Sequence, residues 1–157
     1  MKVILPGSYD PVTLGHLDLI KRASSIYDEV YAVIFINPDK KYKFSLEDRL
    51  NMLKLATNGF YNVTVDESHG YVIDYMRKRG LNKIIKGYRN ETDFEYERIQ
   101  AEYNLKNGGF ETELWQSLPE LKNISSSEVR ARLNSNEKSI RELLPSSVAD
   151  YIEKLKK

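Results

Sequence analysis

A segment rich in glycine and proline near the N-terminus ends in a histidine, and its spacing suits phosphate chemistry. It spans residues 6–16, follows the apolar run Val3-Ile4-Leu5 and precedes an amphipathic stretch from Leu17 to Tyr27. The first N–H groups of a helix have no partner within the helix, and the peptide dipoles favour negative charge there. Gly15 would let a bulky ligand approach the backbone, and the ring N–H of His16 could donate to a phosphate oxygen. A lone histidine at a helix start is often only a cap, but this context favours a phosphate site.

A second candidate cluster is Lys86-Gly87-Tyr88-Arg89, which follows the apolar pair Ile84-Ile85. Two cations on either side of a glycine at a strand end suit the binding of two phosphates, with the backbone close by. The alternative is a solvated strand end that forms ion pairs with the next helix. Asp93 and Glu97 lie one turn apart on that helix, and we expect such carboxylates to pair with a nearby cation such as Arg89. Glu97 could instead accept a hydrogen bond from a ribose hydroxyl, and it alone of the two carboxylates is a candidate site residue.

Two further loops carry groups that suit phosphate. Ser125, Ser126 and Ser127 precede a predicted helix, where they could cap it or bind phosphate oxygens with their hydroxyls and N–H groups. Lys40 and Lys41 lie in the loop that follows the second predicted strand. Of these two lysines, we expect Lys40 to bridge the phosphate of a donor substrate and the phosphate of an acceptor substrate. His69 has no motif around it, and we interpret it as a loop residue.

The composition limits the class of protein. The 157 residues include no cysteine, which excludes disulfides, thiolate metal sites and a cysteine nucleophile. A net charge of +1 argues against nucleic acid or an anionic membrane as partner. No apolar run reaches membrane-spanning length, and a strand near the first residue leaves no room for a signal peptide. We expect one cytoplasmic domain, residues 1–157.

Strand and helix signals alternate along the chain. Apolar β-branched runs predict strands, and helical periodicity recurs between them, with a capping box expected at Ser45 and Asp48. This order predicts right-handed βαβ units, and therefore an α/β, Rossmann-like, doubly wound five-stranded parallel sheet with flanking helices and a helical C-terminus. Ligands of such sheets bind at the carboxyl ends of the strands, where the candidate residues fall. The expected strands are Val3–Leu5, Val30–Ile36, Val63–Val65, Lys83–Lys86 and Thr112–Trp115, and the expected helices are Leu17–Tyr27, Leu46–Ala56, Val72–Arg79, Asp93–Asn107 and Pro145–Leu155.

Together these motifs resemble the bacterial phosphopantetheine adenylyltransferases, within the superfamily of nucleotidyltransferases that share a T-x-G-H motif. The resemblance rests on Thr13-Leu14-Gly15-His16, on the block from Asp93 to Glu97 and on Ile124 to Ser127. It implies a homohexamer that transfers AMP from ATP to 4'-phosphopantetheine with Mg²⁺, giving dephospho-coenzyme A and pyrophosphate. No metal ligand is expected from the protein itself.

The resemblance also implies a role for particular residues. His16, Lys40 and Arg89 would be catalytic, because neutralising and aligning two anions that repel each other is the main task. Acceptor contacts would come from Ser8, Lys40, Val72 and Lys86. ATP contacts would come from Ser8, Tyr9, His16, Gly87, Tyr88, Arg89, Glu97, Leu121, Lys122, Asn123, Ile124, Ser125, Ser126 and Ser127.

Three positions depart from the family pattern and leave alternatives open. Ser8 stands where threonine is usual, Lys86 stands where arginine is usual, and Gly70-Tyr71-Val72 replaces the usual Gly-Leu-Leu. Lysine loses the two-pronged hold on phosphate that arginine gives. The alternatives are a nucleotidyltransferase acting on nicotinamide mononucleotide or, with CTP, on glycerol phosphate, and a catalytically idle nucleotide-binding domain.

Overall fold

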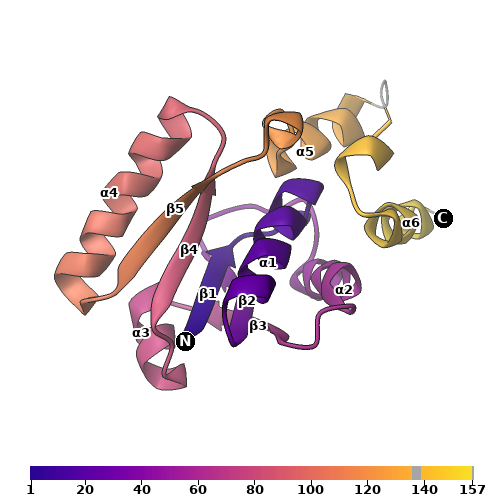
Figure 1. Ribbon diagram of the computed structural model, residues 1–157. Helices are drawn as coiled ribbons and strands as arrows, with labels where there is room; N and C mark the ends of the chain where they lie inside the picture. Colours follow the sequence, from indigo (N-terminus) through magenta and orange to yellow (C-terminus); the bar gives the residue numbers. More distant parts are fainter. Residues whose placement is uncertain (136–138, 157) are drawn as a thin grey trace.

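The computed structural model describes residues 1–135 and 139–156, and it confirms the predicted fold class. Five strands form one parallel sheet in the order β3-β2-β1-β4-β5, with helices on both faces (Figure 1). The strands are β1 (Lys2–Gly7), β2 (Glu29–Ile36), β3 (Val63–His69), β4 (Lys83–Tyr88) and β5 (Glu111–Gln116). The helices are α1 (Leu14–Ile26), α2 (Leu46–Thr57), α3 (Val72–Arg79), α4 (Glu91–Gly108), α5 (Ser126–Ser135) and α6 (Ser146–Leu155), with short 3₁₀ turns at Pro119–Leu121 and Arg141–Leu143.

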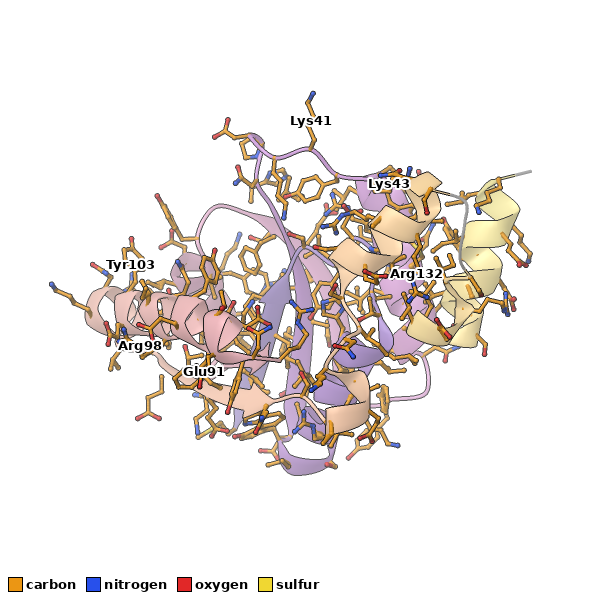
Figure 2. All side chains as sticks on the ribbon, turned by 90° about the horizontal axis from the view of Figure 1, so that it is seen from above. Lys41, Lys43, Glu91, Arg98, Tyr103 and Arg132 are labelled. Carbon is orange, nitrogen blue, oxygen red and sulfur yellow. The ribbon has the colours of Figure 1, made fainter. Side chains whose placement is uncertain are left out.

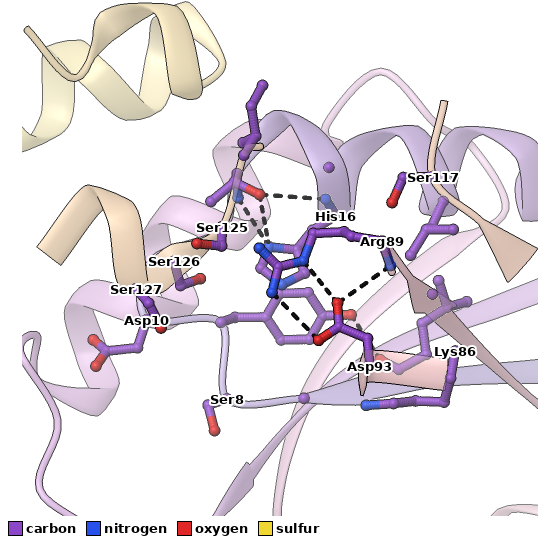
Figure 3. Close-up of a pocket in the computed structure, with 18 of the residues that line it drawn as sticks. Ser8, Asp10, His16, Lys86, Arg89, Asp93, Ser117, Ser125, Ser126 and Ser127 are labelled. Carbon is purple, nitrogen blue, oxygen red and sulfur yellow. Dashed lines mark hydrogen bonds and ion pairs between the residues drawn. The ribbon is translucent and has the colours of Figure 1, made fainter. Parts of the chain in front are cut away.

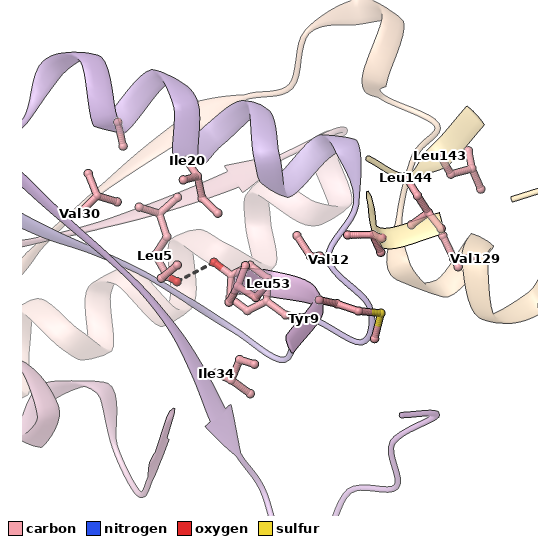
Figure 4. Packing of buried hydrophobic residues seen from close by; sticks show 14 of the residues in the cluster. Leu5, Tyr9, Val12, Ile20, Val30, Ile34, Leu53, Val129, Leu143 and Leu144 are labelled. Atoms are coloured by element: carbon pink, nitrogen blue, oxygen red, sulfur yellow. Dashed lines mark hydrogen bonds between the residues drawn. The ribbon is translucent and has the colours of Figure 1, made fainter. Parts of the chain in front are cut away.

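Each face of the sheet is covered by its own hydrophobic core, because successive strand residues point to opposite sides. On one face, Val3 and Leu5 of β1 pack with buried residues of α1, α2, α5 and α6 (Figure 4). On the other face, Ile4 of β1 and Ile84 of β4 pack against Met76 of α3. The central strand β1 is therefore buried on both sides, and its carboxyl end at Gly7 is held rigidly. The loop that follows β1 starts from this fixed point.

Helix α1 begins at Leu14, three residues before the predicted start at Leu17. The reason is a capping box in which Thr13 is the N-cap and His16 takes the place usually held by Glu or Gln. At α2 the Ser45 hydroxyl does accept a hydrogen bond from the Asp48 backbone N–H, at 3.0 Å. Both caps fix where a helix starts relative to the strand end before it.

Strand β3 is longer than predicted, and His69 is its last residue rather than a loop residue. The added half of the strand contains Asp66. Its carboxylate accepts hydrogen bonds from the Tyr75 hydroxyl at 2.7 Å and from Arg79 at 3.1 Å, both in α3. Since β3 is an edge strand with one solvated side, the charged residues can be accommodated.

Within the described residues, no helix combines the length and the apolar character needed to cross a membrane.

Candidate functional site

A hollow of about 440 Å³ opens at the carboxyl ends of β1 and β4 (Figure 3). Loops after β1, β2, β4 and β5 contribute to its lining, as the position rule for parallel sheets predicts. The candidate residues that line it are Ser8, Tyr9, His16, Lys40, Lys86, Gly87, Arg89, Glu97, Leu121, Ile124, Ser125, Ser126 and Ser127. His16 and Arg89, which come from separate βα units, thus lie on the same hollow.

His16 is fixed in one tautomer by the start of α1. The Thr13 backbone N–H donates to Nδ1 of His16 at 3.0 Å, and the His16 backbone N–H donates back to the Thr13 hydroxyl at 3.4 Å. With Nδ1 accepting, the neutral ring carries its proton on Nε2, which leaves Nε2–H as a donor for a ligand. Burial, together with the positive charges of Lys86 and Arg89, lowers the pKa of His16 to about 4. The imidazole is therefore neutral near pH 7.

The ring of Tyr9 packs against this imidazole, and the Tyr9 hydroxyl binds within the protein rather than facing the hollow. The Tyr9 side chain is buried, and its hydroxyl donates to the Leu5 carbonyl oxygen at 2.7 Å (Figure 4). Its ring centre lies 4.8 Å from that of His16. Tyr9 also has a φ of 48°, in the left-handed region that L side chains rarely adopt. Such backbone strain persists only where the surroundings enforce it, and it gathers at functional sites.

The cations from β4 are held by the carboxylates of α4. Arg89 donates from Nε to the Asp93 carboxylate at 2.9 Å (Figure 3). Lys86 lies 3.6 Å from the Glu97 carboxylate. Lys86 also donates to the Pro6 carbonyl oxygen at 3.3 Å. The expected pairing of Asp93 with Arg89 is confirmed, and both cations also line the hollow, so the pairing leaves the phosphate-binding hypothesis open.

The three serines already have partners within the protein. The Ser125 hydroxyl accepts from the Glu128 backbone N–H at 3.1 Å, which caps α5. The Ser126 hydroxyl donates to the Pro11 carbonyl oxygen at 2.7 Å, and the Ser127 hydroxyl accepts from Arg130 at 3.1 Å. The capping interpretation is therefore correct for Ser125, and this segment is tied to the loop after β1.

Two charged residues that line the hollow, Arg130 and Asp10, escaped the sequence analysis. Arg130 of α5 lines it and donates to the Asp10 backbone oxygen at 2.9 Å. The Asp10 carboxylate, which is buried, accepts from the backbone N–H groups of Lys43 at 2.8 Å and Phe44 at 3.0 Å. The spacing of Arg130 three residues after Ser127 places both on one face of α5, and this was the available signal for the arginine. The Asp10 carboxylate instead binds a loop that lies more than thirty residues further along the chain, and no local sequence pattern reveals such a contact.

A second hollow of about 410 Å³ meets the first and is lined by Val72, as well as by Tyr42, Tyr96 and Asn104. The two hollows share Pro6, Gly7, Ser8, Lys40, Lys86 and Glu97. At this junction the Lys40 ammonium donates to the Ser8 hydroxyl at 3.2 Å. All four residues expected to contact an acceptor, Ser8, Lys40, Val72 and Lys86, line the second hollow.

Some predicted site residues lie elsewhere. Tyr88 lines neither hollow, and its ring packs edge-on against Phe94 at a centre distance of 4.9 Å. Lys122 and Asn123 also line neither hollow, although their neighbours on both sides line the first. The side chain of Lys41 projects away from the ribbon (Figure 2), so of the two adjacent lysines it is Lys40 that reaches the junction.

The described residues contain no group of three or more His, Cys, Asp or Glu side chains arranged to hold a metal ion. The acidic side chains that line the first hollow already interact with cations or backbone N–H groups: Asp10 with Lys43 and Phe44, Asp93 with Arg89, and Glu97 with Lys86.

Comparison with known proteins agrees with this geometry. The chain belongs to the cytidylyltransferase-like family, whose model matches residues 4–132. That match runs from β1 into α5 and so includes every loop that lines the two hollows. A curated phosphopantetheine adenylyltransferase of Streptomyces coelicolor is 41% identical to this chain over 129 residues, which is 82% of this chain and 81% of that relative.

Proposed function

We propose that this protein is a phosphopantetheine adenylyltransferase, an enzyme of coenzyme A biosynthesis. It transfers AMP from ATP to 4'-phosphopantetheine and releases pyrophosphate. The observation that carries the proposal is the pair of hollows that meet at Ser8, Lys40 and Lys86. Two polyanionic substrates need two adjoining hollows with cations at their junction. The 41% identity with the phosphopantetheine adenylyltransferase of Streptomyces coelicolor supports ATP and 4'-phosphopantetheine as these substrates.

In the proposed reaction the phosphate of the acceptor attacks the α-phosphorus of ATP directly. This phosphate is ionised at neutral pH, so it needs no strong general base. Lys40 and Lys86 hold it at the junction of the hollows, and His16 donates from Nε2 to the oxygens of the α-phosphate. The neutral state of His16 suits this role, because the ring can donate without first losing or gaining a proton.

The departing pyrophosphate is held at the other side of the first hollow. Arg89 is fixed there by Asp93, and the N-terminus of α5 at Ser126 offers backbone N–H groups to anionic oxygens. Glu97 lines both hollows and remains our candidate for a ribose hydroxyl. Leu121 and Ile124 contribute apolar lining beside the nucleotide, and backbone groups of Gly87 remain in reach of its phosphates.

Mg²⁺ is proposed to enter with ATP, bound by the phosphate oxygens, because the acidic side chains of the hollow are already paired. When bound it supplies positive charge that offsets the charge of the leaving pyrophosphate.

The proposal is tested by offering the purified protein each nucleotide with each acceptor and measuring pyrophosphate release. The panel pairs ATP or CTP with 4'-phosphopantetheine, nicotinamide mononucleotide, glycerol phosphate or no acceptor. We expect release only with ATP and 4'-phosphopantetheine. Release with another pair would instead identify another small nucleotidyltransferase. Binding of ATP without release from any acceptor would identify an idle nucleotide-binding domain and refute the proposal.

His16→Ala tests the mechanism within this function. Because His16 is proposed to act on the transition state, we expect kcat to fall about 100-fold or more, while the Kd of ATP from calorimetry changes only slightly. Equal losses in kcat and in ATP affinity would show that His16 contributes ground-state binding alone.

We also propose a homohexameric, cytoplasmic enzyme of one domain with no nucleic acid or membrane partner. The support for self-association is an exposed apolar stripe on α4, a helix of 18 residues in which none is buried, beside the face that lines the second hollow. Tyr96, Ile99 and Tyr103 follow one another at helical spacing on that helix and are 63%, 52% and 50% exposed. Light scattering at several concentrations measures the mass, and a monomer at all of them would refute the oligomer.

A further inference from the structure

The loop between β2 and α2, residues 37–45, carries Lys40 to the junction of the two hollows and contains an aromatic residue with no assigned role, Tyr42. The Tyr42 hydroxyl accepts a hydrogen bond from the Asn37 backbone N–H at 3.0 Å, and the Lys40 backbone N–H donates to the Asn37 carbonyl oxygen at 3.1 Å. Asn37 therefore ties down both the lysine and the tyrosine. These contacts close the loop into a tight turn around Lys40.

The ring of Tyr42 lies against two cations. The guanidinium of Arg49 in α2 is 3.9 Å from the ring centre, and the ammonium of Lys40 is 5.4 Å from it. A cation within about 6 Å of an aromatic face is attracted by the ring quadrupole. The ring thus interacts favourably with both positive groups and links the lysine to the arginine.

Arg49 is itself anchored, which makes it a fixed support for the ring. It is only 2% exposed, and it donates to the carbonyl oxygens of Phe44 at 3.2 Å and Ser8 at 3.1 Å. The same residue, Ser8, receives the Lys40 ammonium on its hydroxyl. Arg49 therefore holds the backbone of the residue that Lys40 contacts, and it also holds the ring that lies beside the lysine side chain.

We propose that Tyr42 is a positioning residue that holds Lys40 at the junction of the hollows. Lys40 is exposed, and a lysine side chain has many rotamers, so its placement on Ser8 needs a further constraint. The ring, fixed by Arg49 and by the Asn37 N–H, supplies that constraint. The effect on activity rests on the proposed function, in which Lys40 meets the reacting phosphates.

The test compares Tyr42→Leu, which removes the ring, with Tyr42→Phe, which removes only the hydroxyl. We expect Tyr42→Leu to lower kcat/KM for the acceptor between about 2- and 30-fold, the range that a cation–π contact gives, and Tyr42→Phe to restore most of it. The KM for ATP should change little. Tyr61→Leu is the matched control, because Tyr61 is 98% exposed and should leave both constants unchanged.

A double-mutant cycle separates positioning from general destabilisation. In a Lys40→Ala background, Tyr42→Leu should reduce kcat/KM by less than twofold, because the group that Tyr42 positions is gone. An equal reduction in both backgrounds overturns the proposal, and so does a Tyr42→Phe variant as impaired as Tyr42→Leu.

A crystal structure of Tyr42→Leu decides the matter without any assay. We expect the Lys40 ammonium to leave hydrogen-bond distance of the Ser8 hydroxyl. A lysine still bound to Ser8 refutes the positioning role. This readout holds even if the wild type releases no pyrophosphate from any substrate pair, which would refute the proposed function alone.

Discussion

The stability of the fold should depend on pH through His16 in a way that one substitution removes. The structure lowers the pKa of His16 to about 4, from about 6.5 in an unfolded chain. Between these values the unfolded state binds a proton that the folded state does not, so stability is full above pH 6.5 and is lost as the pH falls toward 4. Lowering the pKa from about 6.5 to about 4 corresponds to a loss of at most about 3 kcal/mol in the free energy of unfolding, of which about 2 kcal/mol is lost between pH 7 and pH 5.

His16→Gln removes the titrating ring and keeps the local structure, because Gln at this position is a usual capping-box residue and can still accept from the Thr13 N–H. The assay is urea unfolding followed by the fluorescence of Trp115, the single tryptophan, at pH 7 and pH 5 and at one protein concentration. We expect the wild type to lose about 2 kcal/mol more than His16→Gln over this interval.

The control is His69→Gln, since His69 is the other histidine and is exposed. The free energy of unfolding of His69→Gln should fall between pH 7 and pH 5 by the same amount as that of the wild type. If the free energies of unfolding of the wild type and His16→Gln fall by equal amounts between pH 7 and pH 5, the burial and charge argument for His16 is wrong.

Three further substitutions probe the site from other sides. Asp93→Asn weakens the ion pair that orients Arg89, so kcat/KM for ATP should fall by up to about fivefold in steady-state assays; an unchanged value would show that Arg89 needs no such support. Lys86→Arg adds a second prong toward the acceptor phosphate and should lower its KM about threefold, and a higher KM would contradict this. Gly87→Ala places a Cβ 2.5 Å from Cδ1 of Leu19 and should cost about 1–3 kcal/mol in urea unfolding, with Leu19→Ala restoring part of the loss; no cost would mean that Leu19 moves aside freely.

The sheet and most of the helices could be predicted because their signals are local. The β-branched run before Gly7 and the capping serine at position 45 each report on structure within a few residues. The second half of β3 could not be predicted in this way. Asp66 lies in that half, and Tyr75 and Arg79 of the next helix bind its carboxylate, a contact that sequence patterns do not show.

The same distinction between local and long-range contacts applies to the candidate site. Its position followed from the strand ends, and the cations Lys40, Lys86 and Arg89 do line the hollows there. The sequence pattern did not show which contacts each of these side chains makes within the protein itself. Ser126 contacts the Pro11 carbonyl from 115 residues away, and only the folded chain reveals this.

Under the proposed function, a chain with a net charge of only +1 must bind two polyanions, and the lengths of its ion pairs bear on how it does so. Arg89 is paired closely with Asp93 at 2.9 Å, whereas Lys86 and Arg130 keep longer contacts with Glu97 and Asp10, at 3.6 and 3.9 Å. The Lys86 side chain is 30% exposed, and a long pair at such a position contributes little to stability, so exchanging it for a phosphate would cost little. Under the proposed function, Lys86 is therefore the cation that an incoming phosphate can recruit most readily, while Arg89 is held by Asp93 and Arg130 by the Asp10 carbonyl oxygen and the Ser127 hydroxyl. In such a site the ion pairs hold the cations in place without ligand, and part of the positive charge remains available to the substrates.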